Sequence, residues 1–155
     1  MVIFAIPLRA KCMAKNWNNC CMRTRRTVDS ICQNNNKNFK IILCGDDRPE
    51  FLNKNYYDDR VEFIECKLEK PKTWLEIARN KYWKLLRICV RVREYLLESQ
   101  NPETGIYVMP ADDDDLIHRD LVGFIEQYPN ENGFYIKNGF VNYGDEKKCL
   151  VRYND

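Results

Sequence analysis

Two short apolar segments constrain the fold of this chain more than any other feature of its sequence. Residues 2–6 read VIFAI and end at Pro7, and residues 39–44 read FKIILC and end at a polar turn. A strand that exposes one face alternates apolar and polar residues, whereas a strand covered on both faces is apolar along its length. We therefore predict two central strands of a parallel sheet with helices on both faces.

The remaining segments predict an alternating α/β order. Residues 16–35 and 73–98 carry apolar side chains at three- and four-residue spacing, which is the pattern of an amphipathic helix. The second of these segments opens with a capping box formed by Thr73 and Glu76. The other predicted elements are strand 61–66, strand 106–109, helix 117–128 and two or three short strands in the tail. This order predicts an open α/β sheet, mostly parallel with an antiparallel edge, in one domain of residues 1–155.

The bulk composition is that of an ordinary globular domain, with 45% hydrophobic and 31% charged residues. A net charge of +2 gives no overall basic footprint for nucleic acid. No window approaches about 18 consecutive apolar residues, so we expect no membrane span. The eight cysteines are dispersed without a C-x-x-C pair, and His118 is the only histidine. We therefore expect free, buried thiols in a reducing cytoplasm, rather than a disulfide framework or a zinc site.

A run of four aspartates, Asp112 to Asp115, follows the predicted strand 106–109 and precedes another apolar segment. Two carboxylates about 5 Å apart repel each other by roughly 3 kcal/mol at an effective dielectric constant of about 20. The run therefore needs a nearby cation, and its oxygen ligands favour Mg²⁺, Mn²⁺ or Ca²⁺ over zinc. The alternative is an exposed acidic loop beside the N-terminus of the next helix.

The alternation of an extended chain divides these four aspartates. Asp112 and Asp114 would point to one side, and Asp113 and Asp115 would point to the other. We therefore expect Asp112 and Asp114 to form one D-x-D metal-binding pair. Asp115 is the next candidate ligand, and Asp113 is directed away from the metal.

A second acidic pair, Asp46 and Asp47, comes directly after the second buried strand. Ligands of open α/β sheets bind beyond the carboxyl ends of the strands, so loops 7–11, 44–49 and 110–116 should share one edge. An acidic residue after this strand can hydrogen-bond a base or a ribose there. The alternative is an Asp-rich turn with no ligand.

The predicted helix 73–98 contains several basic residues. Its apolar stripe comprises Trp74, Ile77, Ala78, Leu85, Ile88, Cys89, Val92 and Leu96. Lys81 falls near the middle of this stripe, so its side chain either extends along its stem to solvent or meets an anion such as phosphate. By contrast, Lys84, Arg87 and Arg91 project beside the stripe and predict an ordinary solvated face.

The sequence lacks the glycine-rich loops that cradle phosphates, since neither G-x-G-x-x-G nor G-x-x-x-x-G-K-[ST] occurs. It also offers no Ser/His or Cys/His pair at a supporting spacing, and a lone histidine such as His118 is more often structural. A diphosphate would therefore have to be held by a metal ion together with lysine or arginine.

Four segments of the chain, taken in order, resemble the donor-binding half of GT-A-fold glycosyltransferases, most closely the large inverting group of family 2. They are VIFAIPLRA, SICQNNNKNFKIILCGDDRPEF, IARNKYWKLL and YVMPADDDDLIHRDL. The strand end D-A-D-D of that family corresponds to Asp112-x-Asp114-Asp115, and the tail NGFYIKNGFVNY resembles its G-W-Y-x-x-x-G-Y segment. The resemblance covers almost the whole chain and implies a Rossmann-like GT-A sheet.

The resemblance also implies an activity, the transfer of a sugar with inversion from a nucleotide-diphosphate donor to a hydroxyl acceptor, assisted by Mn²⁺ or Mg²⁺. Asp112 and Asp114 would contact the metal and the donor diphosphate, with Asp113 beside them. The other implied donor-binding positions are Pro7 and Arg9 at the mouth of the base pocket, Asp46 or Asp47 at the nucleoside, and Lys81 in the donor region.

The sequence departs from the family pattern in two places. The first loop lacks the usual Thr-Tyr-Asn after Pro7, and 40 residues follow Asp115, where the family places its catalytic base in an acidic E-D motif. The acidic candidates there are Asp120, Glu126, Glu131, Asp145, Glu146 and Asp155, none in a matching motif. We therefore expect a donor-binding domain whose acceptor part is short or missing. The alternatives are a non-catalytic nucleotide-sugar-binding or assembly module and a nucleotidyltransferase of related architecture.

Overall fold

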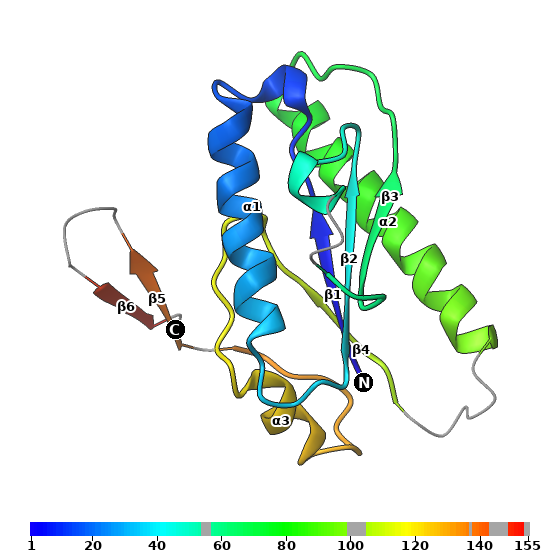
Figure 1. Cartoon of the computed structure of the whole chain (residues 1–155), viewed down its shortest axis with the longest axis vertical. Coiled ribbons are helices and arrows are strands. Elements are labelled where there is room, and N and C mark those ends of the chain that lie inside the picture. Colours follow the sequence, from blue (N-terminus) through cyan, green and yellow to red (C-terminus); the bar gives the residue numbers. More distant parts are fainter. Residues whose placement is uncertain (54–56, 99–104, 137, 143–148, 154–155) are drawn as a thin grey trace.

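The main sheet of the protein consists of parallel strands. The computed structural model describes residues 1–53, 57–98, 105–136, 138–142 and 149–153, the last two ranges by their backbone alone (Figure 1). Its strands are β1 Val2–Pro7, β2 Phe39–Gly45, β3 Val61–Glu65 and β4 Tyr107–Pro110, hydrogen-bonded in the order β3-β2-β1-β4. All three pairings are parallel. The prediction of an α/β sheet is confirmed, and the arrangement is compatible with a Rossmann-like fold.

The central strand β1 is buried along its whole length, as its composition predicts. Side chains of a strand alternate between the two faces of its sheet. Val2, Phe4 and Ile6 accordingly belong to one hydrophobic core, and Ile3 and Ala5 belong to the other.

Helices cover both of these cores. Helix α1, Trp17–Cys32, packs Val28 and Ile31 into the first core, which the short helix α3, Leu121–Glu126, also joins. Helix α2, Trp74–Glu98, packs Ile88 and Val92 into the second core on the opposite face. Figure 1 shows α1 and α2 on the two sides of the sheet. The prediction of helices on both faces is confirmed.

Local hydrogen bonds set where the long helices begin. The Asn16 side chain accepts from the Asn19 backbone N–H at 3.0 Å and caps α1. The Thr73 hydroxyl accepts from the Glu76 N–H at 3.3 Å, as the capping-box pattern predicts. The Glu76 carboxylate, however, accepts from the N–H of Lys72 rather than Thr73, at 2.6 Å. Short 3₁₀ helices, η1 Lys11–Met13 and η2 Glu50–Leu52, follow β1 and β2.

Two predictions about the C-terminal third are wrong. The predicted helix 117–128 is helical only over α3, and in the non-helical segment before it the N–H of Ile117 donates to the Ser30 hydroxyl of α1 at 3.0 Å. The tail strands, β5 Asn138–Asn142 and β6 Cys149–Tyr153, are antiparallel as predicted. They pair with each other in a separate sheet and do not extend the parallel one.

The inward line of α2 also differs from the predicted apolar stripe. The buried residues of α2 are Lys84, Ile88 and Val92, whereas Trp74 is 80% exposed and Cys89 is exposed. The reason is that α2 carries apolar residues on all of its sides. The side on which most of them fall is therefore not a guide to the side that is buried. The prediction that Lys84 belongs to a solvated face is therefore wrong.

The described cysteines are free thiols, as predicted, but the prediction that they are buried is wrong for some of them. Cys44 and Cys66 are buried, and Cys12 and Cys89 are exposed. Burial, reinforced by the neighbouring Cys66, raises the pKa of the Cys44 thiol to about 12. Within the described ranges, none of the helices combines the length and the apolar character that a membrane crossing requires.

The two-sided packing of α2 yields a matched pair of variants. Ile88→Ala should lower the free energy of unfolding by about 2–5 kcal/mol, because Ile88 is fully buried against the sheet and truncation leaves a cavity. Leu86→Ala, on the exposed side of the same helix, should change it by about 0.5 kcal/mol or less. Urea unfolding followed by circular dichroism measures both, and comparable losses would contradict the orientation of α2.

Candidate functional site

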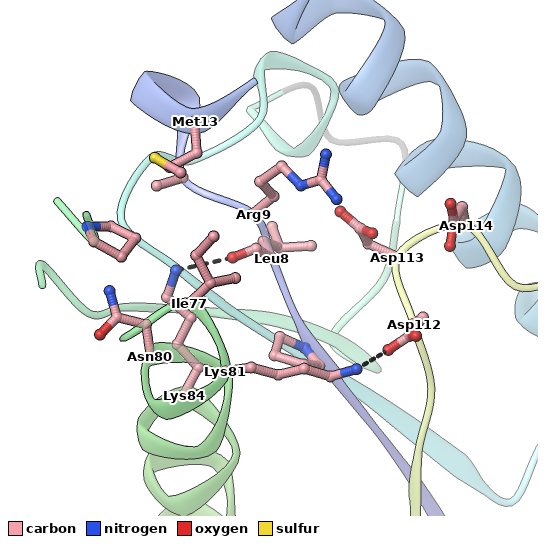
Figure 2. Close-up of a pocket in the computed structure, with 13 residues that line it drawn as sticks. Leu8, Arg9, Met13, Ile77, Asn80, Lys81, Lys84, Asp112, Asp113 and Asp114 are labelled. Carbon is pink, nitrogen blue, oxygen red and sulfur yellow. Dashed lines mark hydrogen bonds and ion pairs between the residues drawn. The ribbon is translucent and has the colours of Figure 1, made fainter. Parts of the chain in front are cut away.

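A cavity lies where the order of the parallel strands reverses. From β1 the chain proceeds through β2 to β3 on one side, and then returns to place β4 on the other side of β1. Doubly wound sheets open a crevice at such a switch point, outside the carboxyl ends of the strands. Here a cavity of about 380 Å³ occupies that position (Figure 2). Its lining residues are Pro7, Leu8, Arg9, Ala10, Met13, Pro71, Ile77, Asn80, Lys81, Lys84, Asp112, Asp113 and Asp114.

The loops after β1, β2 and β4 meet at this edge, as predicted. The N–H of Leu8 donates to the Cys44 carbonyl at 2.8 Å, and the N–H of Lys11 donates to the Asp47 carboxylate at 2.9 Å. The loop after β4 contributes the acidic run to the same cavity. The parallel sheet thus gathers residues from distant parts of the sequence.

Two of the aspartates form ion pairs with cations from different helices. Asp112 pairs with Lys81 of α2 at 2.5 Å, and the two side chains are about half exposed. Asp114 pairs with Arg23 of α1 at 3.6 Å, and both side chains are again about half exposed. Lys81, whose partner the sequence left open, therefore meets an anion of its own chain.

The acidic run is a turn rather than extended chain. The N–H of Asp115 donates to the Asp112 carbonyl at 3.2 Å, and the Asp115 carboxylate accepts from the N–H of Asp112 at 3.0 Å. Alternation along a strand therefore does not apply, and Asp113 lines the cavity together with Asp112 and Asp114. The expectation that Asp113 points away is wrong. Asp115 is not among the lining residues, and its carboxylate holds the turn closed.

The fold perturbs the titration of Asp113. Burial raises the pKa of its carboxyl above the ordinary value, and the charge of Asp114 raises it further. A backbone hydrogen bond and the positive charge of Arg9 offset part of this increase. Figure 2 shows the Arg9 guanidinium group directed toward the Asp113 carboxylate. The cavity thus holds a carboxylate at a position where its charge is disfavoured.

The floor of the cavity is a buried ion pair. The Lys84 ammonium group contacts the Asp46 carboxylate, and the two side chains are 5% and 14% exposed. It also donates to the Leu8 carbonyl at 2.9 Å, while Asp46 accepts from the N–H of Leu68 at 2.8 Å. One lysine therefore ties α2 to the carboxyl ends of β1 and β2.

Some of the predicted site residues line the cavity and others do not. The predicted residues that line the cavity are Pro7, Arg9, Lys81, Asp112, Asp113 and Asp114. Asp46 lies below it and uses both carboxylate oxygens within the protein, and Asp47 binds the backbone of η1. The role of Asp46 or Asp47 at a nucleoside stays a prediction.

Sequence reasoning missed Lys84 and Arg23. Lys84 could have been found from its position four residues before Ile88 and eight before Val92, which places all three on one line of the helix. Arg23 gives no such signal, because its partner Asp114 lies 91 positions further along the chain.

The carboxylates of the cavity could hold a metal ion only together with oxygen atoms of a bound ligand or water. Among the described residues, no group of three or more His, Cys, Asp or Glu side chains is placed to hold a metal ion. Mg²⁺ and its relatives commonly take one or two carboxylates and fill the rest of the shell with water and substrate phosphates. Asp112 and Asp114 supply carboxylate oxygens of this kind at the cavity, and in this structure each contacts a side-chain cation, Lys81 or Arg23.

The candidate catalytic bases lie elsewhere. Asp120 accepts from Asn35 at 2.5 Å, and Glu126 accepts from Asn36 and Asn38. Asn38 immediately precedes β2, so this cluster lies at the amino-terminal edge of the sheet, opposite the cavity. Asp145, Glu146 and Asp155 lie outside the described residues. Of the carboxylates that line the cavity, Asp112 and Asp114 each have a cationic partner, and burial raises the pKa of Asp113.

Comparisons with known proteins add no assignment: a scan against protein-family models and searches of curated proteins and of solved structures each gave no match.

The buried and exposed lysines of α2 predict different stability losses. Lys84→Met should lower the free energy of unfolding by about 3–5 kcal/mol, because the Asp46 carboxylate stays buried without its cation. Lys81→Met, which removes a half-exposed pair, should lower it by about 1 kcal/mol or less. Urea titration of both variants checks this, and a loss for Lys84→Met no larger than for Lys81→Met would refute the buried pair.

The raised pKa of Asp113 predicts a pH-dependent gain on substitution. The folded protein holds this proton at pH values where the unfolded chain has released it, so ionised Asp113 costs free energy of folding. That cost is absent below the ordinary carboxyl pKa of 3.8 and grows as the pH rises through the folded-state pKa. Asp113→Asn should therefore gain stability over the wild type between about pH 4 and pH 8. The exposed Asp59→Asn is the control. An equal gain in stability in that variant would show that the gain does not come from the raised pKa of Asp113.

Proposed function

We propose that the protein is a glycosyltransferase of GT-A architecture that binds a nucleotide-diphosphate sugar in the switch-point cavity and transfers the sugar to a hydroxyl acceptor. The observation that carries the proposal is the meeting of Arg9, Lys81 and Asp112 to Asp114 in one cavity at the strand reversal. Sequence likeness to the family rests on these same positions, and the fold brings them together.

The lining of the cavity has two chemically different parts. Met13 and Ile77 lie on one side in Figure 2, and Asp112, Asp113 and Asp114 lie on the other. A nucleotide sugar is similarly divided between a flat base and a charged diphosphate. Ligand pockets usually combine an apolar wall with a few placed polar groups in roughly 300–1,000 Å³, and this cavity falls within that range.

The exposed ion pairs of the cavity can be exchanged at low cost. Half-exposed pairs such as Lys81 with Asp112 and Arg23 with Asp114 contribute about 1 kcal/mol or less. A diphosphate can therefore draw Lys81 and Arg9 to its own oxygens, which frees carboxylate oxygens for a cation. The buried pair of Lys84 and Asp46 keeps the floor in place meanwhile.

Mn²⁺ or Mg²⁺ would be held by Asp112 and Asp114 together with diphosphate oxygens. When bound, the ion supplies charge neutralisation of the departing nucleoside diphosphate. Lys81 and Arg9 would add positive charge on the same side, and Asp113, whose ionised form is disfavoured here, would be stabilised by any added cation.

A non-catalytic nucleotide-sugar-binding module is the second candidate. It is favoured by one observation, namely that Asp112 and Asp114 at the cavity are both engaged in ion pairs, with Lys81 and Arg23 respectively. Both candidates require the same donor site, and they differ in turnover. Release of nucleoside diphosphate from a bound donor, with or without an acceptor alcohol, supports the enzyme, and tight binding without release supports the module.

Donor binding is tested by isothermal titration of UDP-glucose and dTDP-glucose with Mn²⁺ present or absent. We expect binding that depends on Mn²⁺ and weakens roughly 10- to 100-fold in Asp112→Asn and in Asp114→Asn, since each removes one charge-assisted contact. Asp59→Asn, an exposed aspartate at the opposite edge of the sheet, is the matched control and should bind like the wild type. Absence of binding, or binding that is unchanged in both site variants, overturns the proposal.

A further inference from the structure

The side of α2 that faces away from the sheet is apolar. At about 100° per residue, Leu75, Tyr82, Leu86, Val90 and Leu97 fall within one narrow arc opposite the buried Ile88, and Trp83 borders it. We name these six residues the outer stripe. Their exposed fractions run from 47% at Val90 to 77% at Leu97. A helix that covers a sheet normally turns polar residues to solvent, so the outer stripe is a surface without an obvious role in the fold.

The charges along the outer stripe are all positive. Arg79 and Arg93 fall on the same arc, and no ion pair to either is formed within the described part of the chain. The glutamates of α2 lie off the arc and are already engaged: Glu76 accepts from the Lys72 N–H, and Glu94 and Glu98 pair with Arg91. The stripe therefore combines apolar side chains and arginine without a carboxylate.

This combination matches an anionic lipid surface better than a second copy of the chain. Two outer stripes packed together would enclose four arginines and no carboxylate from the arc, and burying unpaired charge is costly. At an anionic bilayer, leucine and valine enter the acyl boundary, tryptophan and tyrosine lie at headgroup level, and arginine meets lipid phosphate.

The shape of α2 suits a planar partner. The stripe extends over residues 75–97, about 33 Å at 1.5 Å per residue. The opposite side of α2 packs on β1 and β2, and in Figure 1 none of the other labelled helices covers its outer side. A bilayer can therefore approach along the whole length of the helix.

We propose that the outer stripe docks this domain on an anionic membrane surface, with α2 lying in the plane of the interface. Asn80 and Lys81 of the same helix line the cavity, so docking would hold the cavity within about 10 Å, one helix diameter, of the lipid headgroups. The proposal does not depend on which ligand the cavity binds.

Co-sedimentation with vesicles tests the docking. The wild-type chain should pellet with phosphatidylcholine vesicles containing about one third phosphatidylserine, should stay in the supernatant with phosphatidylcholine alone, and should lose affinity as salt rises. Leu86→Glu and Trp83→Glu should abolish pelleting. Arg79→Gln and Arg93→Gln should each weaken it roughly fivefold. Leu116→Glu is the matched control, because Leu116 is 68% exposed outside α2, and it should bind like the wild type.

Any of three results overturns the proposal. The first is a wild-type chain that stays in the supernatant with anionic vesicles at low salt, and the second is a Leu86→Glu variant that pellets as the wild type does. The third is a dimer, seen by sedimentation velocity without lipid, that Leu86→Glu dissociates, which assigns the outer stripe to a second copy. Thermal melting by circular dichroism checks that each variant is folded, and Leu86 is 52% exposed, so its substitution should change the free energy of unfolding little.

Discussion

The buried contact between the Lys84 ammonium group and the Asp46 carboxylate is the interaction on which the geometry of the cavity depends. Removing two charges from water is costly, so this pair is formed only where additional hydrogen bonds complete it, here to the Leu8 carbonyl and from the Leu68 N–H. These bonds join α2 to the ends of β1 and β2 in one arrangement. Because Lys81 lies three residues earlier on the same rigid helix, fixing Lys84 also fixes the position of Lys81 beside the acidic run.

The site therefore contains two classes of ion pair, a buried pair that holds the fold together and half-exposed pairs that a ligand can rearrange. The buried pair cannot open without stranding a charge, whereas the pairs at Asp112 and Asp114 are half exposed and weak. Asp113 differs from both classes, since burial disfavours its ionised form. A ligand that brings positive charge to the aspartates and negative charge to Lys81 can rearrange the weak pairs, and the framework beneath them stays in place.

Local pattern predicted the fold better than it predicted the site. The apolar runs of β1 and β2 identified central strands because burial on both faces leaves a mark at every position. Lys84 was missed because its burial depends on Asp46, 38 residues away, and no periodicity records that partner. The acidic run was misjudged for a different reason: a hydrogen bond between Asp115 and Asp112 turns the chain, and a rule for extended chain does not hold in a turn. Site positions were therefore predicted well where topology set them and poorly where side-chain partners did.

The sheet contacts only one side of α2, so the residues on its outer side are not determined by packing. One line of residues, Lys84, Ile88 and Val92, is enough to seat α2, so the opposite side is free of any packing requirement. Leaving a large aliphatic side chain fully in water forgoes about 1.5–3 kcal/mol relative to burying it, and each of the six partly exposed residues of the outer stripe leaves part of its side chain in water. Arg79 and Arg93 beside this surface form no ion pair within the described part of the chain, so the surface retains a driving force for association with an anionic partner. The same helix that positions Lys81 at the cavity can thus supply the contact that positions the whole domain.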